Sequence, residues 1–419
     1  MKTKRRDESP SHTIARVKVL VVGSGGREHA LAWALTRSTR LTELHAAPGN
    51  PGIAALAACH PVRADDVASL VPLALELELD LVVVGPEAPL VAGLADELRH
   101  HGVAVFGPGA GAARIEGSKA FSKEVMDAAG VPTARTLALA RTPCVVKADG
   151  LAAGKGVWVC RTQAELDAGL RAAEALGQPF HVEELLEGEE VSIFALCDGH
   201  TALALPAAQD YKRIGDGDEG QNTGGMGSYS PVPRLPEAEV AELVESVCSP
   251  VLAELARRGS PFVGVLFAGL MLTGDGPRVL EFNCRFGDPE TQSLLPLLEG
   301  DVLEALAAAA AGDLRGVSLP ASEGAAVTVV LAAGGYPERG DSGTPIAGIE
   351  EAEATGALVF HAGTALHEGR LVTNGGRILN VTGLGDSIAD ARDAAYAAAA
   401  RIDFAGVRLR SDIAAFTRA

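Results

Sequence analysis

The sequence is poor in aromatic residues, which make up only 4% of its 419 positions. Its cores must therefore be built mainly from Ala, Val and Leu, although hydrophobic residues still total 47%, too many for a disordered chain. No apolar run approaches the roughly 18 residues that a membrane-spanning helix needs, so we expect no membrane partner. At about 150 residues a domain, the length indicates roughly three globular domains.

Cysteine is also scarce and lacks a metal-binding pattern. The six cysteines form neither a C-x-x-C pair nor the Cys/His spacing of a zinc site. We interpret them as buried thiols of a protein in the reducing cytoplasm. Residues 1–16 are basic and then polar, without the apolar segment of a secretory signal, and are predicted to be a disordered extension.

Basic residues are outnumbered by acidic ones. Lys and Arg total 36 against 54 Asp and Glu, so the formal net charge is −18. This balance argues against a nucleic-acid partner, which would need a basic face. Any anionic substrate must instead be held by a local cluster of donors, because the overall field of the protein repels it.

Strands and helices alternate through residues 17–117, which predicts a doubly wound α/β domain. Apolar runs ending near glycine read as buried parallel strands. The expected strands lie at 17–23, 41–50 (a strand and its loop), 79–87 and 103–108. Residues 24–35 are expected to be a Gly-rich turn that opens a helix, and further helices are expected at 65–77 and 89–102.

The rest of the chain predicts an α/β and α+β arrangement. We expect a central region over 118–318 with a small lid over about 132–182, a linker at 318–324 and a small α+β domain over 324–419. Single helices are expected at 117–132, 163–176, 236–259, 291–312 and 387–401, and a Gly-rich loop at 215–227.

The segment VVGSGGREH at 21–29 resembles a dinucleotide fingerprint but fails it. Glu28 stands where the third glycine belongs, and the second strand ends without an acid for a ribose, so an NAD site is not expected. A glycine loop at a helix N-terminus still favours an anion. Gly25, Gly26 and Arg27 are therefore candidate phosphate contacts; the alternative is a tight strand–helix turn.

The segment KADGLAAGKGV at 147–157 suits a triphosphate, although its spacing is not that of a Walker loop. Lys147 ends a strand, the glycines let backbone amides approach phosphate oxygens, and Lys155 adds a second charge. The alternative is a flexible hairpin with two solvated lysines.

Two further segments have weaker patterns. In VEELLEGEEVS, Glu183, Glu184 and Glu190 flank strand ends and suggest an adenosine site; alone, they could be solvated carboxylates. In the Gly-rich loop, Lys212 and Arg213 stand in an acidic chain and Asn222 adds a compact donor, which favours an anion-handling role over flexible filler.

The segment VLEFNCRFGDPETQ at 279–292 indicates a metal and phosphoryl site. Glu281 and Asn283 lie two apart on a strand and share a face, and their oxygens suit Mg²⁺ or Mn²⁺. Arg285 can stabilise a transferring phosphoryl group, and Asp288 can hold a substrate ammonium. The alternative is a capped strand–helix connection.

Taken together, these segments resemble the ATP-grasp ligases, and specifically the phosphoribosylamine–glycine ligase family. The motifs that carry the resemblance span about 17–413. They are GSGGREHAL (23–31), GPEAPL (85–90), EGSKAFSK (116–123), KADGLAAGKGV (147–157), QNTGGMGSYSP (221–231), EFNCRFGDPETQ (281–292), AAGGYP (332–337) and VTNGGR (372–377).

The resemblance implies a reaction and its site. ATP, glycine and 5-phosphoribosylamine would give ADP, phosphate and glycinamide ribonucleotide through glycyl phosphate, in purine synthesis, on a monomer. The implied ATP contacts are Lys119, Lys147, Lys155, Glu183, Glu184, Leu186, Glu190 and Asn222; the implied metal ligands are Glu281 and Asn283. The implied substrate contacts are Gly25, Gly26, Arg27, Lys212, Arg213, Arg285 and Asp288, with Arg285 and Lys155 catalytic. Two other readings stay open: another ATP-grasp ligase with a carboxylate substrate, and a nucleotide-sensing protein without activity.

Overall fold

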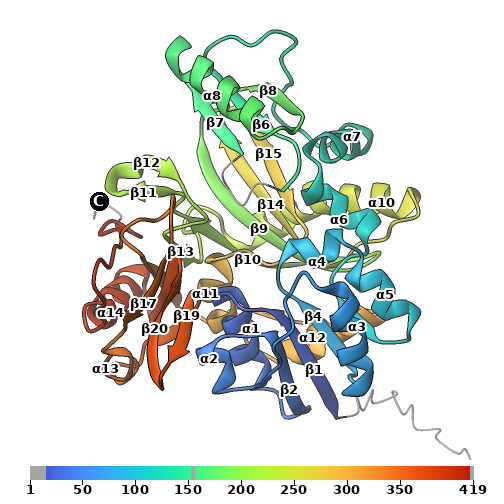
Figure 1. Ribbon diagram of the computed structural model, residues 1–419. Coiled ribbons are helices and arrows are strands. Elements are labelled where there is room, and N and C mark those ends of the chain that lie inside the picture. Colours follow the sequence, from blue (N-terminus) through green and yellow to red (C-terminus); the bar gives the residue numbers. More distant parts are fainter. Residues whose placement is uncertain (1–15, 152–155, 416–419) are drawn as a thin grey trace, which may run out of the picture.

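The computed structural model describes residues 16–151 and 156–415. The predicted extension therefore lies outside the described residues except for its last position, and so does Lys155. Figure 1 shows a lid, which carries α8, β6, β7 and β8, standing above a broad body. Within the described residues, no helix combines the length and the apolar character required to cross a bilayer.

The N-terminal part is a parallel sheet with helices on both sides, as predicted. Its five strands run in the order β3-β2-β1-β4-β5. Strand β1 is central and buried, because its Val-rich sequence packs helices on both faces. The elements are β1 (Val17–Gly23), α1 (Gly26–Leu35), β2 (Leu41–Pro48), α2 (Pro51–Ala54), β3 (Ala58–Cys59), α3 (Val67–Glu76), β4 (Leu81–Val84), α4 (Glu87–Val91), α5 (Leu94–His100), β5 (Ala104–Phe106) and α6 (Ala110–Gly117).

The lid is a small sheet with its own core. Strand β6 lies between β7 and β8, and helix α8 packs on the sheet through Cys160, Leu166 and Val182. Helix α8 lies where the sequence predicts a helix, at 163–176. The elements of the lid are β6 (Cys144–Ala148), β7 (Val157–Cys160), α8 (Gln163–Ala175) and β8 (Phe180–Glu184).

One antiparallel sheet of eight strands joins the central and C-terminal parts. Its order is β15-β14-β9-β10-β13-β16-β21-β18, and Tyr229 on β13 pairs with Val327 on β16. The central elements are α7 (Lys119–Ala129), β9 (Glu189–Asp198), β10 (Ala202–Asp210), β11 (Arg213–Gly215), β12 (Glu219–Asn222), β13 (Gly227–Ser230), α9 (Glu237–Leu243), α10 (Ser249–Arg257), β14 (Val263–Thr273), β15 (Gly276–Asn283), α11 (Glu290–Leu294) and α12 (Val302–Ala311).

The C-terminal part adds a three-stranded sheet, β17-β20-β19, beside this large sheet. Helix α14 lies directly on β21: a Cβ at Gly383 would come within 2.2 Å of the Ala391 carbonyl oxygen. The elements are β16 (Ala325–Ala332), β17 (Asp341–Pro345), α13 (Ile349–Glu353), β18 (Leu358–His361), β19 (Thr364–His367), β20 (Arg370–Gly375), β21 (Arg377–Gly385) and α14 (Ile388–Ala399).

Several helices predicted as single are interrupted. The helix at 89–102 splits into α4 and α5 because Gly93 takes a left-handed conformation, φ +90°. The helix at 291–312 is broken before α12, where the Asp301 carboxylate accepts the Glu304 N–H at 3.0 Å as an N-cap. Between α9 and α10, a π-helical turn, Val244–Cys248, replaces regular α-helix. The predicted Gly-rich loop contains the short pair β11 and β12.

A histidine cluster joins the N-terminal part to the C-terminal part. The His361 N–H donates to His29 Nδ1 at 2.8 Å, and Asn50 Nδ2 donates to the carbonyls of Ser24 and His361, both at 2.8 Å. Burial, with His361 adding to it, lowers the pKa of His29 to about 3, and burial lowers the pKa of His361 to about 4. Both rings are therefore neutral at physiological pH.

We expect the free energy of unfolding to fall as the pH drops below about 6.5. The folded pKa of each histidine lies below its ordinary value, so the unfolded chain takes up protons first. Each ring then lowers the free energy of unfolding by up to about 1.4 kcal/mol for each pH unit. This stability is complete above the unfolded pKa and is lost as the pH falls toward the folded values. Thermal melts across this range measure the slope, and His29→Gln is expected to flatten it; an unchanged slope in that variant contradicts the assignment.

Candidate active site

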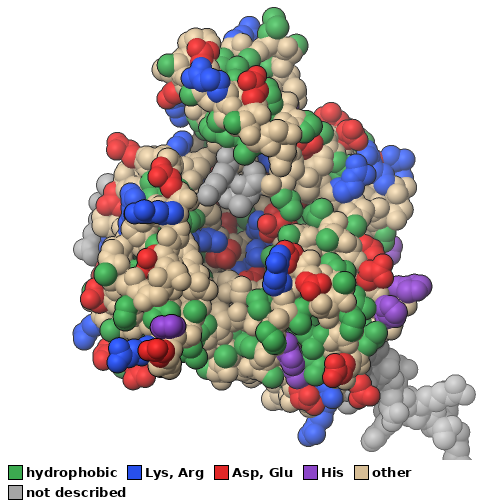
Figure 2. Space-filling model, in the orientation of Figure 1, with side chains coloured by type: hydrophobic (Ala, Val, Ile, Leu, Met, Phe, Trp, Pro, Cys, Tyr) green, Lys and Arg blue, Asp and Glu red, His purple; other side chains and the backbone are tan. Residues whose placement is uncertain are grey.

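A cavity of about 1390 Å³ lies beneath the lid and is lined by all parts of the fold. Figure 2 shows the hollow at the centre of this face, with basic and acidic side chains inside it. The lid contributes Lys147, the large sheet contributes β15, the N-terminal part contributes Arg27, and the C-terminal part contributes Arg377. The cavity therefore gathers the local cationic groups that an acidic protein needs to hold an anion.

A buried carboxylate organises the lysines on the lid side. Glu183 is 2% exposed and accepts from Lys147 at 2.8 Å, Lys123 at 2.9 Å and His181 at 2.9 Å. Burial alone would raise the pKa of Glu183, but His181, Lys147 and Lys123 lower it to about 2. Glu183 is therefore an anion that fixes two ammonium groups. Sequence reasoning missed Lys123, although it lies four residues after Lys119 in the EGSKAFSK motif.

Helix α7 is joined to the glycine loop by Asp149. The Asp149 carboxylate accepts the N–H groups of Lys119 at 2.5 Å and Ala120 at 3.3 Å, at the start of the helix. Lys119 Nζ donates to the Gly150 carbonyl at 3.2 Å and lines the cavity. Lys119 and Lys147 therefore line the same cavity.

The segment after β8 places its predicted residues differently. Leu186 lines the cavity. The Glu184 side chain instead accepts from Arg135 Nη2 at 2.6 Å and is not among the cavity-lining residues. Glu190 lines the cavity and forms an ion pair with Lys212. The Glu184 backbone N–H also donates to the Arg135 carbonyl, at 3.0 Å, so Glu184 is tied to Arg135 rather than to the cavity.

The other predicted loop residues also reach the cavity. Arg213 and Asn222 line it, and Arg213 Nη1 donates to the Gly220 carbonyl at 2.7 Å within the loop. Burial opposes the charge of Lys212, but Glu190, Asp210 and Glu281 raise its pKa well above the ordinary value. Lys212 is therefore a fixed cation facing several carboxylates.

Glu281 and Asn283 both line the cavity from β15. They pair with Gly269 and Phe267 of β14, so they share a face of the sheet. Burial raises the pKa of Glu281, but Lys212, Lys147 and Lys119 outweigh it and leave the pKa below its ordinary value. An ionised carboxylate beside an amide oxygen suits a hard divalent cation whose remaining ligands are phosphates and water.

Two more carboxylates line the cavity that the sequence did not single out, Asp210 and Glu290. Burial raises the pKa of both above their ordinary values, so they ionise less readily than Glu281. Among the described residues, no group of three or more His, Cys, Asp or Glu side chains is arranged to hold a metal. The donor set accordingly fits an ion that binds together with a polyphosphate rather than one held by protein alone.

Arg285 is held by two carboxylates from the N-terminal side. Its Nη2 contacts Glu116 at 2.8 Å and its Nε contacts Glu87 at 3.3 Å, while the Cys284 N–H donates to Glu116 at 2.8 Å. Burial opposes the charge of Arg285, but Glu116 and Glu87 raise its pKa. Glu87 and Glu116 lie in the GPEAPL and EGSKAFSK motifs, where the sequence gave them no role.

The predicted anion loop is partly occupied by its own residues. The Gly25 N–H donates to Glu28 Oε2 at 2.6 Å, and Arg27 Nε contacts Glu28 Oε1 at 2.6 Å. Arg27 lines the cavity, whereas Gly26 packs against Gln292 and Asn380: a Cβ there would come within 2.2 Å of Asn380 Nδ2. Arg27 is thus the member of this loop placed to meet a ligand.

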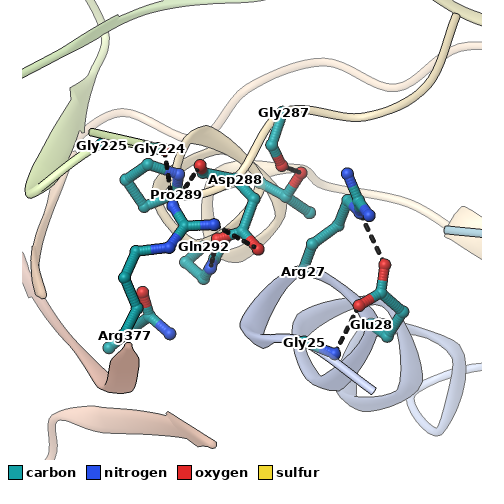
Figure 3. Close-up of polar contacts among 12 residues, drawn as sticks. Gly25, Arg27, Glu28, Gly224, Gly225, Gly287, Asp288, Pro289, Gln292 and Arg377 are labelled. Atoms are coloured by element: carbon teal, nitrogen blue, oxygen red, sulfur yellow. Dashed lines mark hydrogen bonds and ion pairs between the residues drawn. The ribbon is translucent and has the colours of Figure 1, made fainter. Parts of the chain in front are cut away.

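Asp288 lies where this loop meets the C-terminal part (Figure 3). Its Oδ1 accepts from Gln292 at 2.8 Å and its Oδ2 pairs with Arg377 at 3.2 Å. Burial raises the pKa of Asp288, but Arg377, Arg27 and Gln292 outweigh it and leave the pKa lowered. The carboxylate is therefore ionised and held in one orientation at the cavity edge.

A three-stranded lid over an antiparallel sheet, with lysines facing a Glu–Asn pair across the cavity, defines an ATP-grasp ligase. The chain belongs to the phosphoribosylglycinamide synthetase family. The N domain of that family matches residues 17–116, the ATP-grasp (A) domain 117–291 and the C domain 326–416. These matches confirm the predicted resemblance and fold class.

Several known proteins are similar to this chain over almost its whole length. It is 50% identical to a phosphoribosylamine–glycine ligase of Streptomyces coelicolor, covering 95% of this chain and 99% of the relative. A Mesorhizobium japonicum protein of the same name is 49% identical, covering 95% and 97%. The Thermotoga maritima phosphoribosylamine–glycine ligase structure has a TM-score of 0.82 at 34% identity, covering 95% of this chain and 100% of that one. The biotin carboxylase domain of a Hydrogenobacter thermophilus 2-oxoglutarate carboxylase shares only the fold, with a TM-score of 0.70 at 19% identity, covering 94% and 92%.

Proposed function

We propose that this chain ligates glycine to 5-phosphoribosylamine at the expense of ATP, giving glycinamide ribonucleotide, ADP and phosphate in purine synthesis. The observation that carries the proposal is the RFGDPETQ loop (residues 285–292), whose Arg285 and Asp288 line the same cavity as Lys147 of the lid and Lys119 of α7. The family match and the named relatives support it. Cys284, the cysteine nearest this loop, is buried, and burial raises its pKa well above the ordinary value, so it is a poor nucleophile.

ATP would lie between the lid and the large sheet. Lys119 and Lys147 would bind the phosphates. The segment at Leu186 would contact the adenine, and Glu190 would accept hydrogen bonds from the ribose hydroxyls. Asn222 would add a donor from β12. Lys155 keeps its predicted phosphate and catalytic role, although it lies outside the described residues. Glu183 would act indirectly, by fixing Lys147.

Glu281 and Asn283 would hold a divalent cation against the phosphates. Mg²⁺ and Mn²⁺ both accept this oxygen pair. When bound, the ion would neutralise charge on the β- and γ-phosphates. Glu281 suits this role because its lowered pKa keeps the carboxylate ionised.

Catalysis would rest on positioning and charge neutralisation. A glycine carboxylate oxygen attacks the γ-phosphorus, the bond to the β-bridging oxygen breaks, and ADP leaves. The phosphoribosylamine nitrogen then attacks the carbonyl carbon of glycyl phosphate, phosphate leaves with the bonding electron pair, and the nitrogen loses a proton. Arg285 would stabilise the transferring phosphoryl group, Asp288 would hold the glycine ammonium, and Arg27, Lys212 and Arg213 would meet substrate anions. Gly25 and Gly26 would shape the loop that carries Arg27.

We expect ADP release to require glycine, phosphoribosylamine and a divalent metal together. A coupled assay with phosphoribosylamine generated in place, omitting each component in turn, measures this. Turnover with D-alanine or bicarbonate but none with glycine would indicate another ATP-grasp ligase. ATP binding without any turnover would indicate a nucleotide sensor. A monomer in the cytoplasm is part of the same proposal, and size-exclusion chromatography tests the first half of it.

Glu116→Gln is expected to lower turnover on the order of tenfold, the size of one charge-assisted hydrogen bond. The amide keeps an acceptor for the Cys284 N–H but removes the charge that holds Arg285. Steady-state kinetics should show the loss mainly in kcat, with the KM for ATP nearly unchanged. Glu124→Gln is the matched control, because Glu124 lies 67% exposed on α7. Equal losses in the two variants would count against a positioning role for Glu116.

A further inference from the structure

Arg377 lies where two loops from different parts of the chain meet the start of β21 (Figure 3). It is the first residue of β21, and its Nη1 donates to the carbonyls of Gly224 and Asp288, each at 2.6 Å. Its Nη2 pairs with Asp288 Oδ2 at 3.2 Å. One side chain of the C-terminal part thus holds both the Gly-rich loop and the RFGDPETQ loop.

The contacts around Arg377 leave these two loops little freedom. The Gly224 N–H donates to the Tyr336 hydroxyl oxygen at 2.9 Å, so both backbone groups of Gly224 have partners in the C-terminal part. Gly225 has φ +108°, and a Cβ there would come within 2.4 Å of Pro289 Cδ. The backbone at Gly225 therefore packs against the Pro289 ring, and the Arg377 guanidinium between the two loops sets their relative position.

The Asp288 carboxylate is the part of this arrangement that faces a ligand. Asp288 and Arg377 both line the cavity, and Arg377 is 20% exposed there. Gln292 holds Oδ1 and Arg377 holds Oδ2. Because a carboxylate has about four acceptor sites, it can still accept an ammonium. Arg377 also favours the ionised form of Asp288.

We propose that Arg377 is a positioning residue for glycine: it orients the Asp288 carboxylate toward the glycine ammonium and fixes the Gly224 loop beside it. The inference rests on the proposed function. It makes the C-terminal part a determinant of glycine affinity rather than only a covering element. Most of the proposed ATP contacts among the described residues lie on α7, the lid, the segment at Leu186 and β9, which Arg377 does not contact. Only Asn222 lies in the loop that Arg377 holds, so the KM for ATP is expected to change little.

The test compares Arg377→Gln and Arg377→Lys in the full chain. Arg377→Gln is expected to raise the KM for glycine by about 10- to 100-fold, as expected for lost charge-assisted bonds, while the KM for ATP stays within about twofold. Arg377→Lys keeps the positive charge but loses the planar guanidinium that binds two acceptors at once. Its KM for glycine should therefore lie between those of Arg377→Gln and wild type. The acid limb of kcat/KM for glycine should move to higher pH in Arg377→Gln, because Asp288 loses its cation. Asp288→Asn should raise the KM for glycine similarly, and the double variant should be little worse.

A matched control and the contrary outcomes complete the test. Arg257→Gln removes an arginine that pairs with Glu254 on the surface of α10, outside the cavity, and should leave all three KM values unchanged. If Arg377→Gln lowers kcat/KM equally for all three substrates and leaves the pH profile unchanged, the role of Arg377 is only structural. A rise confined to the KM for phosphoribosylamine assigns Arg377 to the other substrate. If Arg377→Gln does not fold, the glycine KM and pH profile of Arg377→Lys decide. Failure of the proposed function is distinguishable, since wild-type protein would then show no glycine-dependent ADP release.

Discussion

Glu281→Gln is expected to reduce turnover on the order of 10²-fold or more, because the ion it would hold neutralises the separating phosphates. The substitution keeps the shape of the side chain and removes its charge. Folding should survive, since Glu281 faces the cavity rather than the core. Steady-state rates at saturating glycine across a Mg²⁺ titration, together with a thermal melt, measure both expectations.

The neighbouring ligand provides the control for this prediction. Asn283→Asp keeps an oxygen and adds a charge, so it should retain part of the activity with an altered preference between Mg²⁺ and Mn²⁺. Adenosine affinity measured without metal should change little in either variant, because Leu186 lies between β8 and β9, and Glu190 lies on β9 rather than on β15. Near wild-type turnover of Glu281→Gln at limiting Mg²⁺ would make the Glu–Asn pair purely structural.

Arg285→Met is expected to reduce kcat on the order of 10³-fold, the lower end of what a phosphate-stabilising arginine contributes. Arg285→Lys should recover little of this, because one ammonium cannot reproduce the contacts of the guanidinium to Glu116, Glu87 and the Phe286 carbonyl. Rapid-quench measurement of ADP formation isolates the phosphoryl-transfer step.

The fold should tolerate the loss of Arg285 better than a usual buried ion pair does. Burial, the largest influence, already raises the pKa of Glu116, so this carboxyl can take up a proton when its cation is removed. Pairing Arg285→Met with Glu116→Gln removes the more buried of the two carboxylates that hold Arg285 and leaves Glu87, which is 24% exposed. The double variant should regain most of any lost melting temperature without regaining kcat. Recovery of kcat in the double variant would show that Arg285 acts through folding alone.

Much of the fold could be predicted because its signals are local. The Val-rich run of β1, the glycine loop after it and the helix that follows are each read from consecutive residues. Helix boundaries were less accessible: the left-handed Gly93 and the cap at Asp301 compete with an otherwise continuous apolar pattern.

In the candidate site, too, residues in local motifs could be predicted and their distant partners could not. Glu281, Asn283 and Lys147 stand in motifs whose chemistry follows from spacing, and all three line the cavity. The partners that hold such groups come from distant segments: Glu116 is 169 positions from Arg285, and Arg377 is 153 positions from Gly224. No periodicity links residues so far apart, and only the folded chain brings them into contact.

The eight-stranded sheet also decides which parts of this protein can be separated. Strand β13 pairs with β10 on one side and with β16 on the other, so a chain ending at residue 318 would leave the β13 edge unpaired. Such an edge recruits other strands and promotes aggregation. The lid has its own sheet and small core, so it can be exchanged or rotated as a unit. The C-terminal part is instead an extension of the central sheet, and an engineered chimera that exchanges it would have to cut within a continuous hydrogen-bonded ladder.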